Sequence, residues 1–200
     1  MDEERFWQGA EHAARFFRGE ADVHRALERL VGILEAEKIP YAIVGAMALN
    51  EFGYRRVTVD VDVLLTAAGL AALKAACLGR GYLEKFAGSR GLRDTESGVD
   101  IDVLITGGFP GDGKPKPVSF PDPAKAAVRG SRVALLPLPK LIELKLASGM
   151  SAPHRLKDLA DVIELVRAAS LPKELAAALD PYVRDKYLEL WLAAQATEPE

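Results

Sequence analysis

Two segments of this 200-residue chain alternate apolar residues with aspartates, and this pattern restricts the fold more than any other feature. A period of two predicts β-strands, here over residues 57–65 and 99–105, with one face on a core and the other open. Sheets of this kind are mixed or antiparallel, so we expect an α+β fold with flanking helices. The open faces of the two strands carry Asp60 and Asp62 in the first and Asp100 and Asp102 in the second.

The rest of the chain predicts helices around this sheet. Apolar residues at helical spacing indicate helices over 22–38, 139–147, 154–168 and 181–194. We therefore expect an α/β core over 22–136, a C-terminal helical part over 137–194 packed on that core, and a tail over 195–200. Nine of the seventeen residues from 107 to 123 are Gly or Pro, which predicts a long loop, either a flap over a substrate or a solvated segment.

Composition places the chain among ordinary globular proteins. Half of its residues are hydrophobic and no stretch is long and apolar enough to cross a membrane. A single cysteine, Cys77, excludes an intrachain disulfide, so we expect a cytoplasmic protein without a signal peptide. The net charge of −3 argues against binding nucleic acid through overall charge, yet residues 125–158 hold seven Lys or Arg and two acids. This local excess suits a phosphorylated ligand, or it is only solvated surface.

The paired aspartates predict a divalent metal site. Alternate residues of a strand share a face about 7 Å apart, so the carboxylates of Asp60 and Asp62 can converge on one cation. Hard oxygen ligands favour Mg²⁺ or Mn²⁺, and a third carboxylate from the second strand would complete a two-metal site. The alternative is a wet sheet face, although aspartate is disfavoured in strands.

A glycine turn precedes the first acidic strand. Residues 41–44 predict a short strand, and Gly45 then opens a helix that ends near Gly53. Such a turn can present backbone N–H groups to a phosphate, with Gly45 and Ala46 as the contacts. Glycine at this place also has a purely conformational explanation.

Together these motifs closely resemble the DNA polymerase β-like nucleotidyltransferase superfamily, and most of all small bacterial members related to AbiEii and other toxin–antitoxin nucleotidyltransferases. The resemblance covers about residues 22–168. It implies a nucleotidyltransferase fold and Mg²⁺-dependent transfer of a nucleoside monophosphate from an NTP. The motifs that carry it are Val44-Gly45-Ala46, the segments 53–62 and 99–104, and the C-terminal segments 138–147 and 155–161.

The resemblance also assigns residues. It implies that Asp60, Asp62 and Asp102 are the metal ligands and catalytic carboxylates, with Asp100 as the alternate for the third. The family's first motif reads Gly-Gly or Gly-Ser, whereas this chain has Gly45-Ala46, which removes a serine hydroxyl from the phosphate site.

Further candidates lie around the phosphate site. Arg56 and Thr58 lie four and two positions before Asp60, so in a strand they would share its face. Both are therefore candidates for nucleotide contacts, although Arg56 would also suit an exposed strand edge. Lys145 falls inside an apolar helical stripe, where it would bind phosphate, pair with an aspartate or extend to solvent. The resemblance implies that Asp158 positions Lys145 or the sheet. Alternatively, the acids of this helix are exposed, with Asp161 paired to Lys157 four residues earlier.

The sequence thus supports a Mg²⁺-dependent nucleotidyltransferase whose acceptor is RNA, a tRNA end, a protein hydroxyl or a small molecule. The same resemblance implies a toxin–antitoxin or phage-defence role, with a cognate antitoxin as the protein partner. The main alternative is a binding or regulatory protein that keeps the fold without efficient catalysis, which Ala46 favours. A phosphatase of the haloacid dehalogenase type fits poorly, because the apolar strand continues to Leu65 where that mechanism needs a loop.

Overall fold

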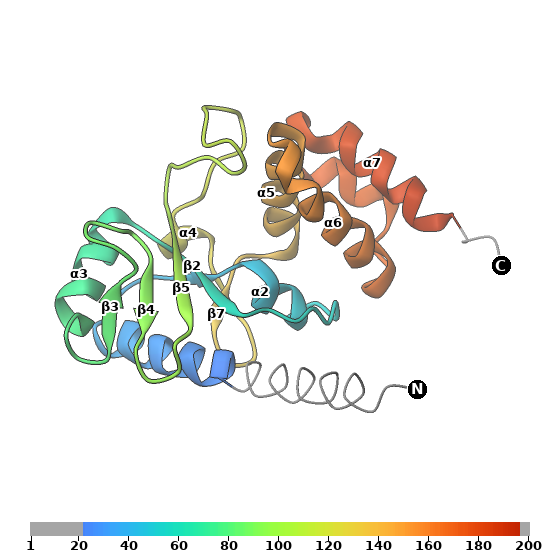
Figure 1. Ribbon diagram of the computed structural model, residues 1–200. Helices are drawn as coiled ribbons and strands as arrows, with labels where there is room; N and C mark the ends of the chain where they lie inside the picture. The colour runs from blue at the N-terminus through green and yellow to red at the C-terminus, as the bar shows by residue number, and fades with distance from the viewer. Residues whose placement is uncertain (1–21, 197–200) are drawn as a thin grey trace, which may run out of the picture.

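The computed structural model describes residues 22–196, so the last four residues of the expected tail lie outside the described range. All strands lie in the first two thirds of this range, together with several helices, and the last third is helical (Figure 1). After a first helix over residues 22–36, the elements are β1 (Ala42–Ile43), α2 (Gly45–Glu51), β2 (Asp60–Leu65), α3 (Ala67–Cys77), β3 (Tyr82–Glu84), β4 (Leu92–Asp94), β5 (Asp100–Ile105), α4 (Pro123–Ala126), β6 (Val128–Arg129), β7 (Ala134–Leu135), α5 (Leu138–Ser151), η1 (Pro153–Arg155), α6 (Leu156–Ala168), η2 (Lys173–Ala178) and α7 (Pro181–Gln195).

Seven strands form one mixed sheet in the order β3-β4-β5-β2-β1-β7-β6. β2 runs parallel to β5 and β1 runs parallel to β7, while the other neighbouring pairs are antiparallel. The α+β class with a mixed sheet is therefore confirmed. None of the helices within residues 22–196 is long and apolar enough to cross a membrane.

The pairing of β2 with β5 sets the positions of all four aspartates. Asp60 lies opposite Asp100 and Asp62 lies opposite Asp102. Equivalent residues of an in-register pair point to the same face, so the acidic faces of the two strands become one surface. Two motifs that are forty residues apart in the sequence are thereby adjacent in space.

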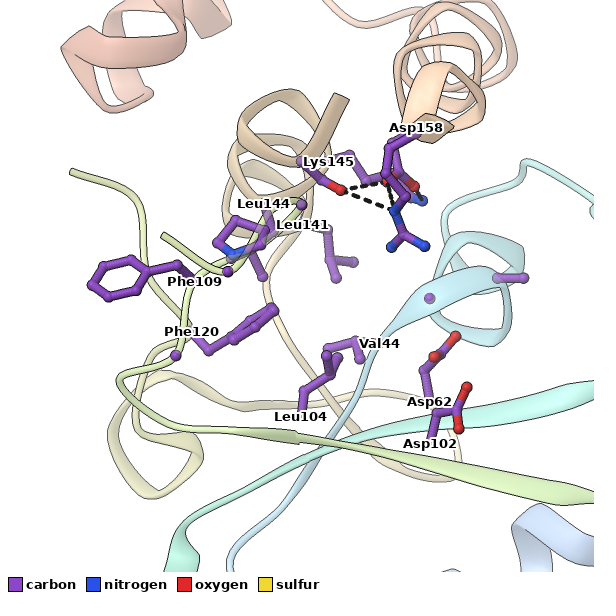
Figure 2. Close-up of a pocket in the computed structure, with 18 of the residues that line it drawn as sticks. Val44, Asp62, Asp102, Leu104, Phe109, Phe120, Leu141, Leu144, Lys145 and Asp158 are labelled. Carbon is purple, nitrogen blue, oxygen red and sulfur yellow. Dashed lines mark hydrogen bonds and ion pairs between the residues drawn. The ribbon is translucent and has the colours of Figure 1, made fainter. Parts of the chain in front are cut away.

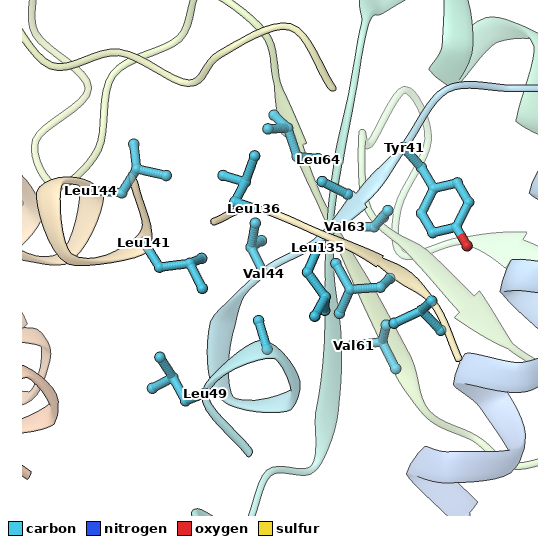
Figure 3. Close-up of a cluster of buried hydrophobic side chains, with 14 of the residues drawn as sticks. Tyr41, Val44, Leu49, Val61, Val63, Leu64, Leu135, Leu136, Leu141 and Leu144 are labelled. Carbon is cyan, nitrogen blue, oxygen red and sulfur yellow. The ribbon is translucent and has the colours of Figure 1, made fainter. Parts of the chain in front are cut away.

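The opposite face of β2 belongs to the core, where Val61 and Val63 are fully buried. In Figure 3 they lie in a cluster with Leu135 and Leu136 of the β7 region. Leu141 and Leu144 of α5 belong to the same core but reach it from the face of the aspartates, since both line a cavity together with Asp62. The C-terminal helices thus pack on the sheet (Figure 3). In Figure 1, α5, α6 and α7 pack together at one side of the sheet, while the first helix and α3 lie at the other. This packing places α5 across from the acidic surface.

The expected strand over 57–65 begins only at Asp60. Val57 and Val59 are exposed, by 38% and 73%, although they continue the alternating pattern. The reason is that Asp60 already pairs with Asp100, the first residue of β5, so no neighbouring strand extends far enough to pair with residues 57–59. This segment instead forms an edge of the functional cleft.

Candidate active site

A cavity of about 730 Å³ lies between the acidic surface of the sheet and the helices α5 and α6 (Figure 2). The sheet contributes carboxylates to one wall, and the helices contribute cations to the other. All nine site residues expected from the sequence line this cavity, whereas the alternate Asp100 is not among its lining residues. The nine are Gly45, Ala46, Arg56, Thr58, Asp60, Asp62, Asp102, Lys145 and Asp158.

Gly45 is required because Asp62 lies directly against it. Its φ of +63° is in the left-handed region, and a Cβ built on it would lie 1.8 Å from Oδ2 of Asp62. Any side chain at this position would displace the carboxylate, since the contact is far inside van der Waals distance. The backbone N–H of Val44 also donates to the carbonyl oxygen of Asp62, at 3.0 Å. The glycine turn therefore fixes both the backbone and the side chain of Asp62.

The carboxylates of Asp60 and Asp62 differ in environment. The hydroxyl of Thr58 donates to Oδ1 of Asp60 at 2.5 Å, which orients that side chain. Burial, followed by the charges of Asp60 and Asp102, raises the pKa of Asp62 from 3.8 to about 6. Lys145 and Arg155 act in the opposite direction, and the rise shows that they do not offset the burial and repulsion. Asp62 is thus an anion that lacks sufficient positive charge nearby.

Asp102 is partly neutralised by a lysine that the sequence did not indicate. Nζ of Lys85, in the turn after β3, lies 3.0 Å from Oδ1 of Asp102 and 3.1 Å from Oδ2 of Asp100. Arg93 of β4 binds the other oxygen of Asp100 at 2.9 Å. Asp100 is therefore held by two cations at the edge of the site, while Asp102 is bound by Lys85 through Oδ1 and lines the cavity. Nothing in the sequence indicated this contact, because Lys85 follows a strand of only three residues, which is too short to show a period of two.

The facing wall is an ion network built on Lys145. Its Nζ lies 3.0 Å from Oδ1 of Asp158 and 2.7 Å from Oδ2 of Asp161. Figure 2 shows Lys145 and Asp158 on the wall that faces the aspartates of the sheet. Arg56 reaches the same Asp161 oxygen at 2.5 Å, which connects the segment before β2 to α6. Arg155 lies 3.1 Å from Oδ2 of Asp158. Three cations therefore share two carboxylates, and one positive charge is left to face the cleft.

Burial would raise the pKa of Asp158, but the charges of Lys145 and Arg155 and the hydrogen bonds to this carboxylate together outweigh it. Together with the hydroxyl of Ser148, which donates to Oδ2 at 2.6 Å, Lys145 holds the pKa of Asp158 below its ordinary value. Asp158 is consequently ionised and positions the ammonium of Lys145 at the cavity wall. Ser148 was not predicted, although it lies three residues after Lys145 and thus on a neighbouring part of the same helix face.

Two expectations about this wall are corrected by the structure. Asp161 does not pair with Lys157, because it is 2% exposed and points inward to Lys145 and Arg56. Lys145 does not extend to solvent either, since only 12% of its side chain is exposed. The i, i+3 spacing of Asp158 and Asp161 on α6 was the available signal that both could face one partner.

The donor set fits a hard divalent cation. Three carboxylates from adjacent strands line one cavity, and the raised pKa of Asp62 marks the repulsion that a cation would relieve. Within residues 22–196, however, no three His, Cys, Asp or Glu side chains are already gathered closely enough to hold a metal ion. Asp102, the third carboxylate, is paired with Lys85 in this structure.

Comparison with known proteins supports the fold. No model of a protein family matches the sequence, and no curated protein matches it. Among solved structures, the antibiotic-resistance factor ANT(2'')-Ia has a TM-score of 0.54 at 15% identity, covering 84% of this chain and 94% of that one. A protein from H. pylori that has been proposed to be a nucleotidyltransferase has a TM-score of 0.51 at 15% identity, covering 88% and 93%.

These likenesses extend over nearly the whole length of both solved proteins. ANT(2'')-Ia is an aminoglycoside nucleotidyltransferase. The chain therefore has the nucleotidyltransferase fold, with its α+β sheet and its C-terminal helices. At this level of identity the likeness defines the architecture, and the chemistry has to be argued from the cleft itself.

Proposed function

We propose that this protein is a Mg²⁺-dependent nucleotidyltransferase that moves a nucleoside monophosphate from an NTP to an acceptor hydroxyl. One observation carries the proposal. Asp60, Asp62 and Asp102, on two adjacent parallel strands, line the same cavity as the cationic network of Lys145 and Arg56. Carboxylates that can hold metal on one wall and cations on the other are what a metal-bound polyphosphate requires.

Asp60, Asp62 and Asp102 would hold Mg²⁺ or Mn²⁺. The chemistry that such an ion supplies when bound is neutralisation of phosphate charge and activation of a hydroxyl. Gly45 and Ala46 would contact the phosphates through their backbone, and Thr58 would keep Asp60 oriented. These roles agree with the motifs of the polymerase β-like family and with the positions of the residues around one cavity.

The proposed reaction is an in-line displacement at the α-phosphorus. The acceptor oxygen forms a new bond to phosphorus, the bond to the pyrophosphate oxygen breaks, and pyrophosphate leaves with that electron pair. A carboxylate oxygen of Asp102 accepts the hydroxyl proton. Lys145 and Arg56, which belong to the wall opposite the carboxylates, offset the charge that develops on the leaving group.

The acceptor and the biological role are the finer part of the proposal. Beyond the network, Arg90 and Lys157 also line the cavity, and these cations suit an anionic acceptor such as RNA, including a tRNA end. A protein hydroxyl is the other acceptor that we propose. The motifs shared with AbiEii and other toxin–antitoxin nucleotidyltransferases support a role in toxin–antitoxin or phage-defence systems. A cognate antitoxin would then be the protein partner.

The test uses NTPs labelled in the α-phosphate or in the γ-phosphate. Each is incubated with the protein, Mg²⁺ and either total RNA, total protein or small-molecule extract. We expect α-label in one acceptor fraction, no transfer of γ-label, and loss of transfer with Asp62→Asn. The matched control is Asp185→Asn, an exposed acid of α7 outside the cavity, which should transfer like wild type. Transfer of γ-label would instead indicate a kinase.

A specific observation favours a second candidate, a nucleotide-binding or regulatory protein with weak catalysis. The third carboxylate is drawn aside by Lys85, and Ala46 replaces the serine or glycine of the family motif. This candidate predicts binding of Mg²⁺-NTP without label transfer to any fraction. The same experiment therefore separates the two candidates when it is accompanied by a binding measurement.

A further inference from the structure

The cleft continues beyond its charged region into a part with an apolar wall. We call this part the aromatic subsite, and Figure 2 shows its side chains along the same cavity as Asp62 and Asp102. It is formed by Val44, Leu104, Phe109, Phe120, Leu141 and Leu144. None of these side chains carries a hydrogen-bonding group.

Both walls change from charged to apolar next to the proposed phosphate site. On β5, Leu104 is the next residue on the face of Asp102, about 7 Å along the strand. On α5, Leu144 and Leu141 lie one residue and one helical turn before Lys145. A ligand whose phosphates lie between Asp102 and Lys145 would therefore place its next group against these leucines.

The loop that carries the two phenylalanines is a fixed wall. The N–H of Phe120 donates to the carbonyl of Gly108 and the N–H of Gly107 donates to the carbonyl of Phe120, both at 2.8 Å. Further along, Gly111 packs on α5 so closely that a Cβ there would lie 2.2 Å from Oγ of Ser151. The segment expected to be a flap or a solvated loop thus joins the sheet to α5 and shapes the subsite before any ligand arrives.

We infer that the aromatic subsite binds a nucleobase, and this inference rests on the proposed nucleotidyltransferase function. Half-buried aromatic rings beside aliphatic side chains, continuous with a phosphate site, suit a flat heteroaromatic ring that stacks and excludes water. The whole cavity, at about 730 Å³, is in the range of sites that enclose a complete small ligand. The base has two possible sources, the NTP itself or the terminal nucleotide of an RNA acceptor.

The composition of the subsite also defines its selectivity. Reading one base against another needs donors or acceptors aimed at the base edge. The six side chains of the subsite provide none, whereas stacking tolerates every base. The four NTPs should therefore bind with affinities within about tenfold of one another.

The test compares nucleotides with inorganic tripolyphosphate, which has the phosphates but no base. Calorimetry in Mg²⁺ should show ATP and UTP binding wild type more tightly than tripolyphosphate does. Phe109→Ala should weaken both NTPs by about 5- to 100-fold and leave tripolyphosphate unchanged, while Phe109→Trp should keep NTP affinity. Phe86→Ala is the matched control, because Phe86 is 70% exposed and lies outside the cavity.

The source of the base is settled by adding a short single-stranded RNA as a second probe. Weaker RNA binding by Phe109→Ala, with unchanged NTP binding, would support the subsite as the place of the acceptor base. Unchanged binding of both probes would overturn the inference, and so would wild-type NTP affinity no higher than that of tripolyphosphate together with unchanged RNA binding by Phe109→Ala. In those cases the proposed function survives if tripolyphosphate binds and α-label is transferred. If wild type binds neither NTP nor tripolyphosphate, both proposals fall.

Discussion

Replacing Asp62 with asparagine should stabilise the metal-free protein, although it removes a central residue of the site. The pKa of Asp62 rises from 3.8 to about 6 because of burial and the neighbouring carboxylates. One pKa unit corresponds to about 1.36 kcal/mol, so ionised Asp62 lowers the free energy of unfolding by about 3 kcal/mol at most. The cleft is open and the side chain only half-buried, and the new amide also needs hydrogen bonds, so we expect a net gain of about 1–2 kcal/mol.

The pH dependence gives this prediction its sign. The folded-state pKa of Asp62 lies above its unfolded value, so its contribution to stability is complete below pH 4 and is lost as the pH rises through about 6. Asp62→Asn has no such loss. Urea unfolding at pH 4.5 and pH 8, in the presence of a chelator, should therefore show the advantage of Asp62→Asn increasing with pH.

Asp94 provides the matched control for the same substitution. It is 1% exposed and bound by Arg29. Burial would raise the pKa of Asp94, but the hydrogen bonds from Arg29, the backbone N–H of Glu96 and Ser97 together lower it. Asp94→Asn should lower the free energy of unfolding by about 3 kcal/mol or more at pH 8, since it breaks a buried pair. If Asp62→Asn were equally destabilising at pH 8, or if its effect did not vary with pH, the argument from uncompensated charge would be wrong. Mg²⁺ should raise the Tm of wild type and leave that of Asp62→Asn almost unchanged.

Two further substitutions test the charges on either side of the cleft. Lys85→Met removes the ammonium that competes for Asp102, so Mn²⁺ affinity measured by calorimetry should rise by up to about fivefold, whereas Arg93→Met should change it less. Lys145→Met removes the shared partner of Asp158 and the buried Asp161, so the free energy of unfolding in urea should fall by about 3 kcal/mol and the Tm increase caused by Mg²⁺-NTP should shrink. Lys173→Met, at an exposed lysine outside the cavity, should do neither.

The sheet and its acidic surface could be predicted because they depend on local pattern. A period of two fixes which face each aspartate occupies, and glycine before the first acidic strand marks a close approach. The extent of β2 could not be predicted, since Val59 alternates correctly but has no partner strand. Alternation records which side chains share a face, and strand length depends on the neighbour.

Of the cationic wall, Arg56, Lys145 and Asp158 were predicted as separate site residues, but their network was not predicted. Helical spacing identified Lys145 as a buried cation, and its partners were left open because they lie on another helix. Asp161 looked exposed on a helical wheel, since a wheel shows one helix and takes no account of Arg56, 105 residues earlier in the chain. Lys85 was missed for a related reason, because its contact with Asp102 depends on the pairing of β4 with β5.

Ligand binding in this cleft must exchange ionic partners as well as neutralise the uncompensated charge of Asp62. A cation at Asp102 competes with Lys85, and a phosphate at Lys145 competes with Asp158 and Asp161. Either ligand alone displaces internal pairs on one wall and leaves the opposite wall as it was. A metal–phosphate complex satisfies both walls together, so the two ligands should bind cooperatively. Because such coupling is reciprocal, NTP should increase Mn²⁺ affinity by the same factor as Mn²⁺ increases NTP affinity. Independent binding of the two would show that the carboxylates and the cations do not act on one ligand.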